Sequence, residues 1–125
     1  MTLLTRANRQ GTITSASTTV PADVQAIQID GDIPLADMTD PLNIVTARIF
    51  VSPDNGQSWR LVFTYGWQGG IGIDKFTGLE APSRLSFAFG PIEPYTGWLM
   101  RGELDIQRSM RIGLDLTINP PPRIP

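Results

Sequence analysis

The stretch Ser52-Pro53-Asp54-Asn55-Gly56-Gln57-Ser58-Trp59 determines how the middle of this chain folds. Proline, aspartate, asparagine and glycine favour tight turns because they preset φ, bond to nearby backbone or tolerate positive φ. The preceding residues, Ile44 to Val51, are apolar on both faces, which is typical of a central strand. The following residues, Arg60 to Trp67, alternate large apolar or aromatic side chains with smaller ones. We therefore predict two antiparallel strands joined by this turn.

The spacing within the turn resembles the Asp-box, the Ser/Thr-x-Asp-x-Gly-x-Thr/Ser-Trp hairpin signature of sialidase-type propellers. All five diagnostic positions match, namely Ser52, Asp54, Gly56, Ser58 and Trp59. In such a turn the aspartate accepts hydrogen bonds from its own loop, the glycine takes a positive φ and the tryptophan packs under the turn. The motif occurs once, whereas a propeller needs several four-stranded blades. We expect it to close a turn; a sugar contact through Trp59 is the functional alternative.

The end of the chain carries two further runs of strand-like alternation, Trp98 to Ile106 and Met110 to Ile118. If Gln107-Arg108-Ser109 is a hairpin loop, apolar residues or glycine face one another on the inner side. The outer side then pairs opposite charges, Asp105 with Arg111 and Arg101 with Asp115. The pattern predicts a closing hairpin.

Twelve glycines, eleven prolines and few helix-period stretches indicate an all-β chain. We predict a single β-sandwich or jelly roll of about seven to eight antiparallel strands over residues 11–118. Residues 1–10, polar and without a clear period, are predicted to form an N-terminal arm. Residues 119–125 are predicted to form a proline-rich C-terminal arm. The segment from Ile33 to Pro41 reads as a loop with one helical turn that the proline ends.

The composition argues against most catalytic chemistry. The 125 residues include no cysteine and no histidine, so there is no thiolate, no disulfide framework and no imidazole base or ligand. A net charge of −2 gives no electrostatic footprint for nucleic acid or for an anionic membrane. The N-terminus lacks the apolar core of a secretory signal, which favours synthesis in the cytoplasm. We expect no cofactor and no enzymatic activity.

Two weaker signals leave alternatives open. Four acidic residues could bind calcium through their oxygens, although caps and turns explain them more simply; they are Asp30, Asp32, Asp37 and Asp40. Four aromatic residues could form a sugar-binding platform if at least two were coplanar and exposed, although aromatic residues at a period of two are mostly core; they are Tyr65, Trp67, Tyr95 and Trp98.

The glycine-rich loop from Gly66 to Gly78 is the best functional candidate by position, because long loops on rigid β scaffolds tend to carry function. Its apolar tip suits burial against a partner, and folding back onto its own sheet is an equal alternative. Together with basic residues near both ends, the loop supplies the candidate partner-binding residues: Arg6, Arg9, Gln68, Ile71, Ile73, Lys75, Phe76 and Arg123.

Taken along the chain, the pattern resembles small β-sandwich accessory proteins of tailed bacteriophages, such as the cement or decoration proteins of capsids. The resemblance is carried by five segments in order: Val20-Pro21-Ala22, the turn from Asp37 to Pro41, Ser52 to Trp59, Trp67-Gln68-Gly69-Gly70, and Arg101 to Ile118. It implies a non-enzymatic virion protein, made in the host cytoplasm, that binds capsid or tail subunits, with self-association as a further option. The alternative is a carbohydrate-binding module or receptor-binding tip.

Overall fold

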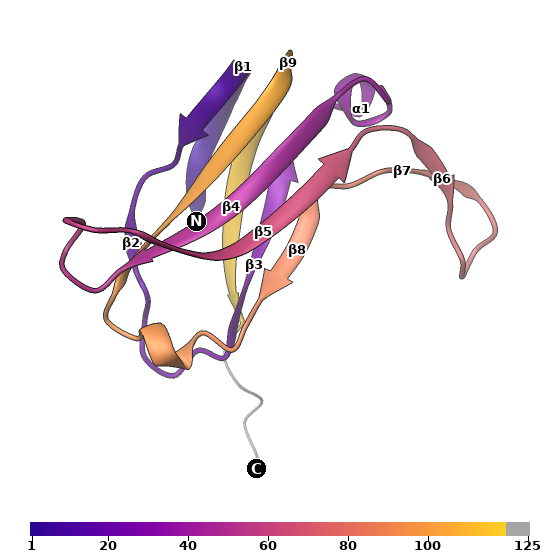
Figure 1. Ribbon diagram of the computed structural model, residues 1–125. Coiled ribbons are helices and arrows are strands. Elements are labelled where there is room, and N and C mark those ends of the chain that lie inside the picture. The colour runs from indigo at the N-terminus through magenta and orange to yellow at the C-terminus, as the bar shows by residue number, and fades with distance from the viewer. Residues whose placement is uncertain (120–125) are drawn as a thin grey trace.

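The computed structural model describes residues 1–119, and Figure 1 shows their arrangement. In chain order the elements are β1 Thr2–Thr14, β2 Thr18–Thr19, β3 Ala26–Asp32, α1 Leu35–Met38, β4 Ile44–Ser52, β5 Arg60–Gln68, β6 Ile71–Ile73, β7 Glu80–Pro82, β8 Ser86–Phe89, the 3₁₀ turn η1 Glu93–Tyr95, and β9 Leu99–Asn119. The prediction of an all-β fold is confirmed. The expected helical turn before Pro41 is α1, and neither helix of residues 1–119 is long and apolar enough to cross a membrane.

One strongly bent antiparallel sheet contains seven strands of residues 1–119, with β5, β4, β9, β3 and β8 in order and β1 and β2 along another edge of β9. The first half of β9 pairs with β4, where Val45 lies opposite Ile106. The second half pairs with β3, where Asp30 lies opposite Asp115. Because one long strand serves both halves, the sheet folds over on itself into a sandwich that is nearly closed, like a barrel.

The predicted closing hairpin at residues 107–109 is wrong, because β9 continues through this stretch as one bent strand. Arg9 of β1 lies opposite Met110, and Gly11 lies opposite Ile106, so three residues of β9 face a single residue of β1. This bulge bends both strands, and Gly11 accommodates the bend with a φ of 81°. The charges expected to pair across a hairpin therefore have other neighbours.

The predicted N-terminal arm is also wrong, because residues 2–14 form β1. Leu3 is buried in the core, and the terminal ammonium of Met1 donates to the carbonyl oxygen of Leu116 at 2.8 Å. The polar composition follows from position: within residues 1–119 β1 pairs only with β9, so much of its surface faces solvent. Most of the predicted C-terminal arm, residues 120–125, lies outside the described residues, and Asn119 is the last residue of β9.

The core fills the space between the two halves of the bent sheet. Its fully buried side chains include Ile27 and Ile29 of β3, Val45 and Ile49 of β4, and Leu104, Ile106, Ile112 and Leu114 of β9. Aromatic rings close the seam between the two outer strands β5 and β8, where the described residues form no backbone ladder. Phe87 stacks on Phe63, with ring centroids 5.3 Å apart, and on Tyr65 at 4.9 Å. The seam is therefore held by side-chain packing.

Candidate functional site

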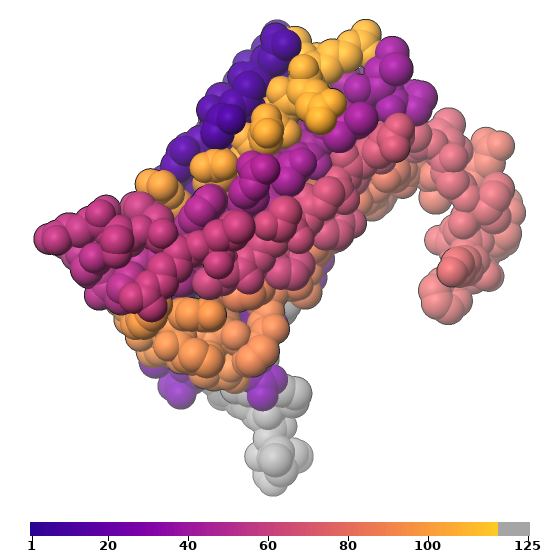
Figure 2. Space-filling view, viewed as in Figure 1, coloured from indigo at the N-terminus to yellow at the C-terminus, as the bar shows by residue number. Residues whose placement is uncertain are grey.

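A β-hairpin extends away from the folded sheet, and we call it the finger (residues 69–83). It contains β6 and β7, which pair with each other in a separate two-stranded sheet. Figure 2 shows the finger standing clear of the body. Its apolar side chains face solvent: Ile71 is 61%, Ile73 66%, Phe76 100% and Leu79 68% exposed. Folding back onto its own sheet, the alternative drawn from the sequence, is therefore wrong.

Hydrogen bonds hold the tip of the finger in one conformation. The carboxylate of Asp74 accepts from the amides of Phe76 at 2.8 Å and Thr77 at 3.2 Å. The amide of Gly78, at a φ of 70°, donates to the carbonyl oxygen of Asp74 at 2.8 Å. Such an aspartate-stabilised turn orders the backbone before any partner arrives. The tip therefore presents the fully exposed ring of Phe76 on a preorganised support.

The base of the finger is tied to the segment around α1. The amide of Gly69 donates to the carbonyl oxygen of Asn43 at 2.9 Å, and that of Gly70 to Met38 at 3.0 Å. The side chain of Gln68 donates to the carbonyl oxygen of Pro41 at 2.8 Å, so it serves the base of the finger. A groove of about 210 Å³ opens beside these contacts. Its lining residues are Leu35, Thr39, Ile71, Glu80, Ala81 and Pro82.

The predicted partner-binding residues fall into separate places. Gln68 ends β5 at the base of the finger, and the finger carries Ile71, Ile73, Lys75 and Phe76. Arg6 and Arg9 lie on β1, and Arg123 lies outside the described residues.

The two arginines of β1 contact their own sheet. Arg6 pairs with Asp32 at 3.6 Å. The guanidinium of Arg9 donates to the carbonyl oxygens of Thr5 at 2.7 Å and Ile112 at 3.3 Å.

Sequence reasoning missed two exposed apolar residues of the finger and the groove at its base. They are Leu79 on the finger and Leu35 on α1, which are 68% and 65% exposed. Leu79 follows Gly78 within a short polar stretch, so its spacing alone gives no sign of exposure. A predicted hairpin between residues 71 and 82 would have placed Leu79 opposite Asp74, near the tip. The structure has this pairing, with the amide of Asp74 donating to the carbonyl oxygen of Leu79 at 2.9 Å.

The Asp-box forms the turn that its sequence predicts, and the β4–β5 hairpin is confirmed. One carboxylate oxygen of Asp54 accepts from the hydroxyl of Ser52 and the amide of Ser58, each at 2.8 Å. The other accepts from the hydroxyl of Ser58 at 2.7 Å, and the amide of Gly56, at a φ of 92°, donates to the hydroxyl of Ser52. Every polar member of the motif is used within the turn.

Hydrogen bonds from the hydroxyl and amide of Ser58, and then from the hydroxyl of Ser52, lower the pKa of Asp54 from 3.8 to about 2. Because the folded-state pKa is depressed, the turn has its full stabilisation above the unfolded pKa of 3.8 and loses it as the pH falls towards about 2. We expect the carboxyl ¹³C resonance of Asp54 to titrate with a midpoint of about 2. In Ser58→Ala the midpoint should rise towards 3.8. A wild-type midpoint near 3.8 would contradict the hydrogen bonding.

The aromatic residues do not form a shared exposed platform. Trp67 is buried, with 4% of its surface accessible. Tyr95 and Trp98 meet edge to face at 64°, while Tyr65 stacks on the core seam. The guanidinium of Arg101 covers the ring of Trp59 at 4.1 Å from its centroid. Sugars stack on open ring faces, so this geometry does not favour the carbohydrate-binding alternative.

The four acidic residues considered for calcium have separate partners. Asp32 pairs with Arg6, and Asp37 accepts from the amide of Arg111 at 3.0 Å. Asp40 accepts from the amide of Leu42 and pairs with Arg108 at 3.3 Å. Among residues 1–119, no group of three or more histidines, cysteines or acids is placed to hold a metal ion. Asp40 serves a turn, as the sequence suggested, while Asp32 and Asp37 bind residues distant in sequence.

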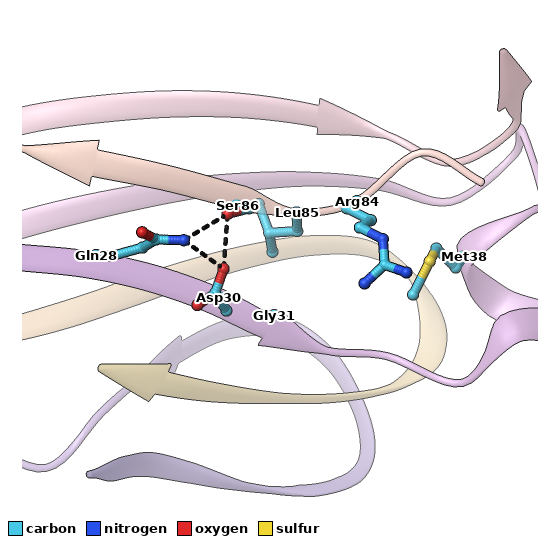
Figure 3. A pocket seen from close by; sticks show the side chains of 7 residues that line it. All are labelled: Gln28, Asp30, Gly31, Met38, Arg84, Leu85 and Ser86. Atoms are coloured by element: carbon cyan, nitrogen blue, oxygen red, sulfur yellow. Dashed lines mark hydrogen bonds between the residues drawn. The ribbon is translucent and has the colours of Figure 1, made fainter. Parts of the chain in front are cut away.

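Asp30 instead lines a cavity of about 320 Å³ near α1 (Figure 3). Its carboxylate accepts from the hydroxyl of Ser86 at 2.6 Å and the side-chain amide of Gln28 at 3.2 Å. Figure 3 places the guanidinium of Arg84 on the far side, beside Met38. The Ser86 hydroxyl faces a carboxylate, which is a much weaker base than the imidazole that activates serine nucleophiles. The cavity is a polar network with no activated nucleophile.

Comparison with protein-family models, with curated proteins and with solved structures found no match for this chain. The function of the chain must therefore be inferred from its own residues. They form an all-β body with an ordered finger whose apolar residues face solvent.

Proposed function

We propose that this chain is a non-enzymatic structural protein of a virion, of the cement or decoration type, which binds capsid or tail subunits through its finger. The observation that carries the proposal is the exposure of Ile71, Ile73, Phe76 and Leu79 on one ordered projection. Isolated exposed apolar side chains are ordinary on protein surfaces, whereas a gathered apolar patch marks an interaction site.

The physical form of the finger favours a protein partner. An isolated two-stranded hairpin is marginally stable in water, so a finger with an apolar surface gains stability when a partner covers it. The hydrogen bonds of Asp74 preorganise the tip, which lowers the entropy lost on docking. A fully exposed aromatic residue at such a tip, here Phe76, is the kind of anchor that dominates binding energy once a pocket buries it.

The virion assignment itself comes from the resemblance to phage accessory proteins, and the finger supplies the contact surface that such a role requires. Such proteins act by contact, so they need an anchor and no catalytic group. On this account the Asp-box closes a rigid hairpin of the body, and the body holds the finger at a fixed position through the bonds of Gly69 and Gly70.

Sedimentation tests this function. In lysates of cells that produce the phage encoding the chain, we expect the protein to migrate on a density gradient with assembled particles and to remain with them through a second gradient. Recovery only in the light fractions, with complete particles formed without it, would contradict the proposal.

A further inference from the structure

The backbone direction of β6 shows which edge of the finger is open. The amide of Asp74 donates to the carbonyl oxygen of Leu79, and the amide of Ser83 donates to that of Gly70, each at 2.9 Å. The carbonyl group of Gly70 and the N–H group of Asp74 therefore point towards β7. Because backbone direction alternates along an antiparallel strand, Gly72 also faces β7, and Ile71 and Ile73 direct their N–H and C=O groups to the free edge.

The two edges of the finger differ in chemistry. By the same alternation Glu80 and Pro82 face outwards on β7, since they lie opposite Ile73 and Ile71. Proline has no N–H to donate and an edge charge discourages pairing, so β7 carries two devices that block strand addition. β6, with the sequence Ile-Gly-Ile, carries neither. It is an open, uncharged edge that can accept another strand.

We propose that the partner of this edge is a second copy of the chain, which adds its own β6 antiparallel about a twofold axis through Gly72. In this register Ile71 and the second copy's Ile73 exchange backbone hydrogen bonds, and the two Gly72 residues meet between them. Such a pairing is self-complementary, as a twofold interface requires. It places the isoleucines of both copies on one face of a four-stranded sheet, where they cover one another.

The same register brings the tip of each finger to the base of the other. Lys75 and Phe76, next to each other at the tip, lie beyond the paired residues 71–73. The pairing therefore uses the backbone edge of β6 and leaves the ring of Phe76 for a capsid or tail subunit. This inference rests on the assembly role proposed above and adds a second copy at the β6 edge as a further partner of the finger.

A single cysteine at the axis tests the pairing, because the chain has no cysteine of its own. A Cβ at Gly72 meets nothing within 4 Å, and the same holds for Gly66 on β5, which gives a matched control. Glycines facing at a non-hydrogen-bonded position lie about 4.5 Å apart, which is within the range for a disulfide. We expect Gly72→Cys to form a disulfide dimer at least about tenfold faster than Gly66→Cys, because pairing raises the effective thiol concentration. Equal rates would overturn the proposal.

Light scattering adds a test that needs no cysteine. The wild-type chain should have the mass of a dimer, and Ile73→Pro, which removes an outward N–H, should be monomeric with an unchanged circular dichroism spectrum. A wild-type monomer at all concentrations would overturn the pairing. A monomer that still migrates with particles would leave the assembly role standing and remove only the second copy. A dimer that never enters particles would support the pairing of two copies and contradict the assembly role.

Discussion

Phe87→Ala is expected to cost about 3–5 kcal/mol of unfolding free energy, a large part of the roughly 5–15 kcal/mol that holds a typical domain together. Phe87 is buried in the seam between β5 and β8, where it stacks on Phe63 and Tyr65. Since no backbone ladder joins these strands within residues 1–119, removing the ring opens a cavity where the sheet has only side-chain contacts.

Denaturant unfolding measures this effect, and Phe76→Ala is the matched control. It removes the same ring from a site that is fully exposed, so its unfolding free energy should stay within about 0.5 kcal/mol of the wild type. If the two variants lost equal stability, the seam would not be closed by Phe87.

Gly113→Ala is the second substitution with a large expected effect. A Cβ on Gly113 would lie 2.7 Å from the carbonyl oxygen of Leu4 and 2.8 Å from the amide nitrogen of Arg6, closer than real Cβ atoms approach backbone. Strands β1 and β9 must then separate next to the irregular pairing between Leu4 and Ala7. We expect a loss of about 1–3 kcal/mol, the usual range for overpacking.

The loss should be localised. Amide hydrogen exchange should accelerate first in β1, because opening of a weakened strand precedes global unfolding. Gly66→Ala provides the control, since its Cβ meets nothing within 4 Å. Unchanged exchange in β1 of the Gly113→Ala variant would show that the close approach of the two strands is incorrect.

The sequence was sufficient where local chemistry decides the structure. The Asp-box supplies its own hydrogen-bond donors and acceptors, so the β4–β5 hairpin follows from eight consecutive residues. It was insufficient for β9. Ile106 and Met110 are four residues apart. They lie on the same face of the sheet whether the strand is continuous or turns back as a hairpin, so both models bury the same apolar side chains. Only the distant pairing with β1 distinguishes the two.

The candidate site was predicted in part for a related reason. Ile71, Ile73 and Phe76 stand out in the sequence as apolar residues among glycines, and the structure places them together on the finger. Whether they fold back depends on the bonds of Gly69 and Gly70 to the segment around α1, which are contacts between residues far apart in sequence. The polar β1 was misassigned because an exposed edge strand and a free arm have similar compositions.

Docking through the finger is tested most directly by Phe76→Ser on the particle gradient, beside Leu42→Ser as control. Both residues are exposed and apolar, at 100% and 64%, and Leu42 lies outside the finger. We expect Phe76→Ser to stay in the light fractions as a folded protein, because it loses the anchor, and Leu42→Ser to migrate with particles like the wild type. Migration of Phe76→Ser with particles at the wild-type level would contradict it.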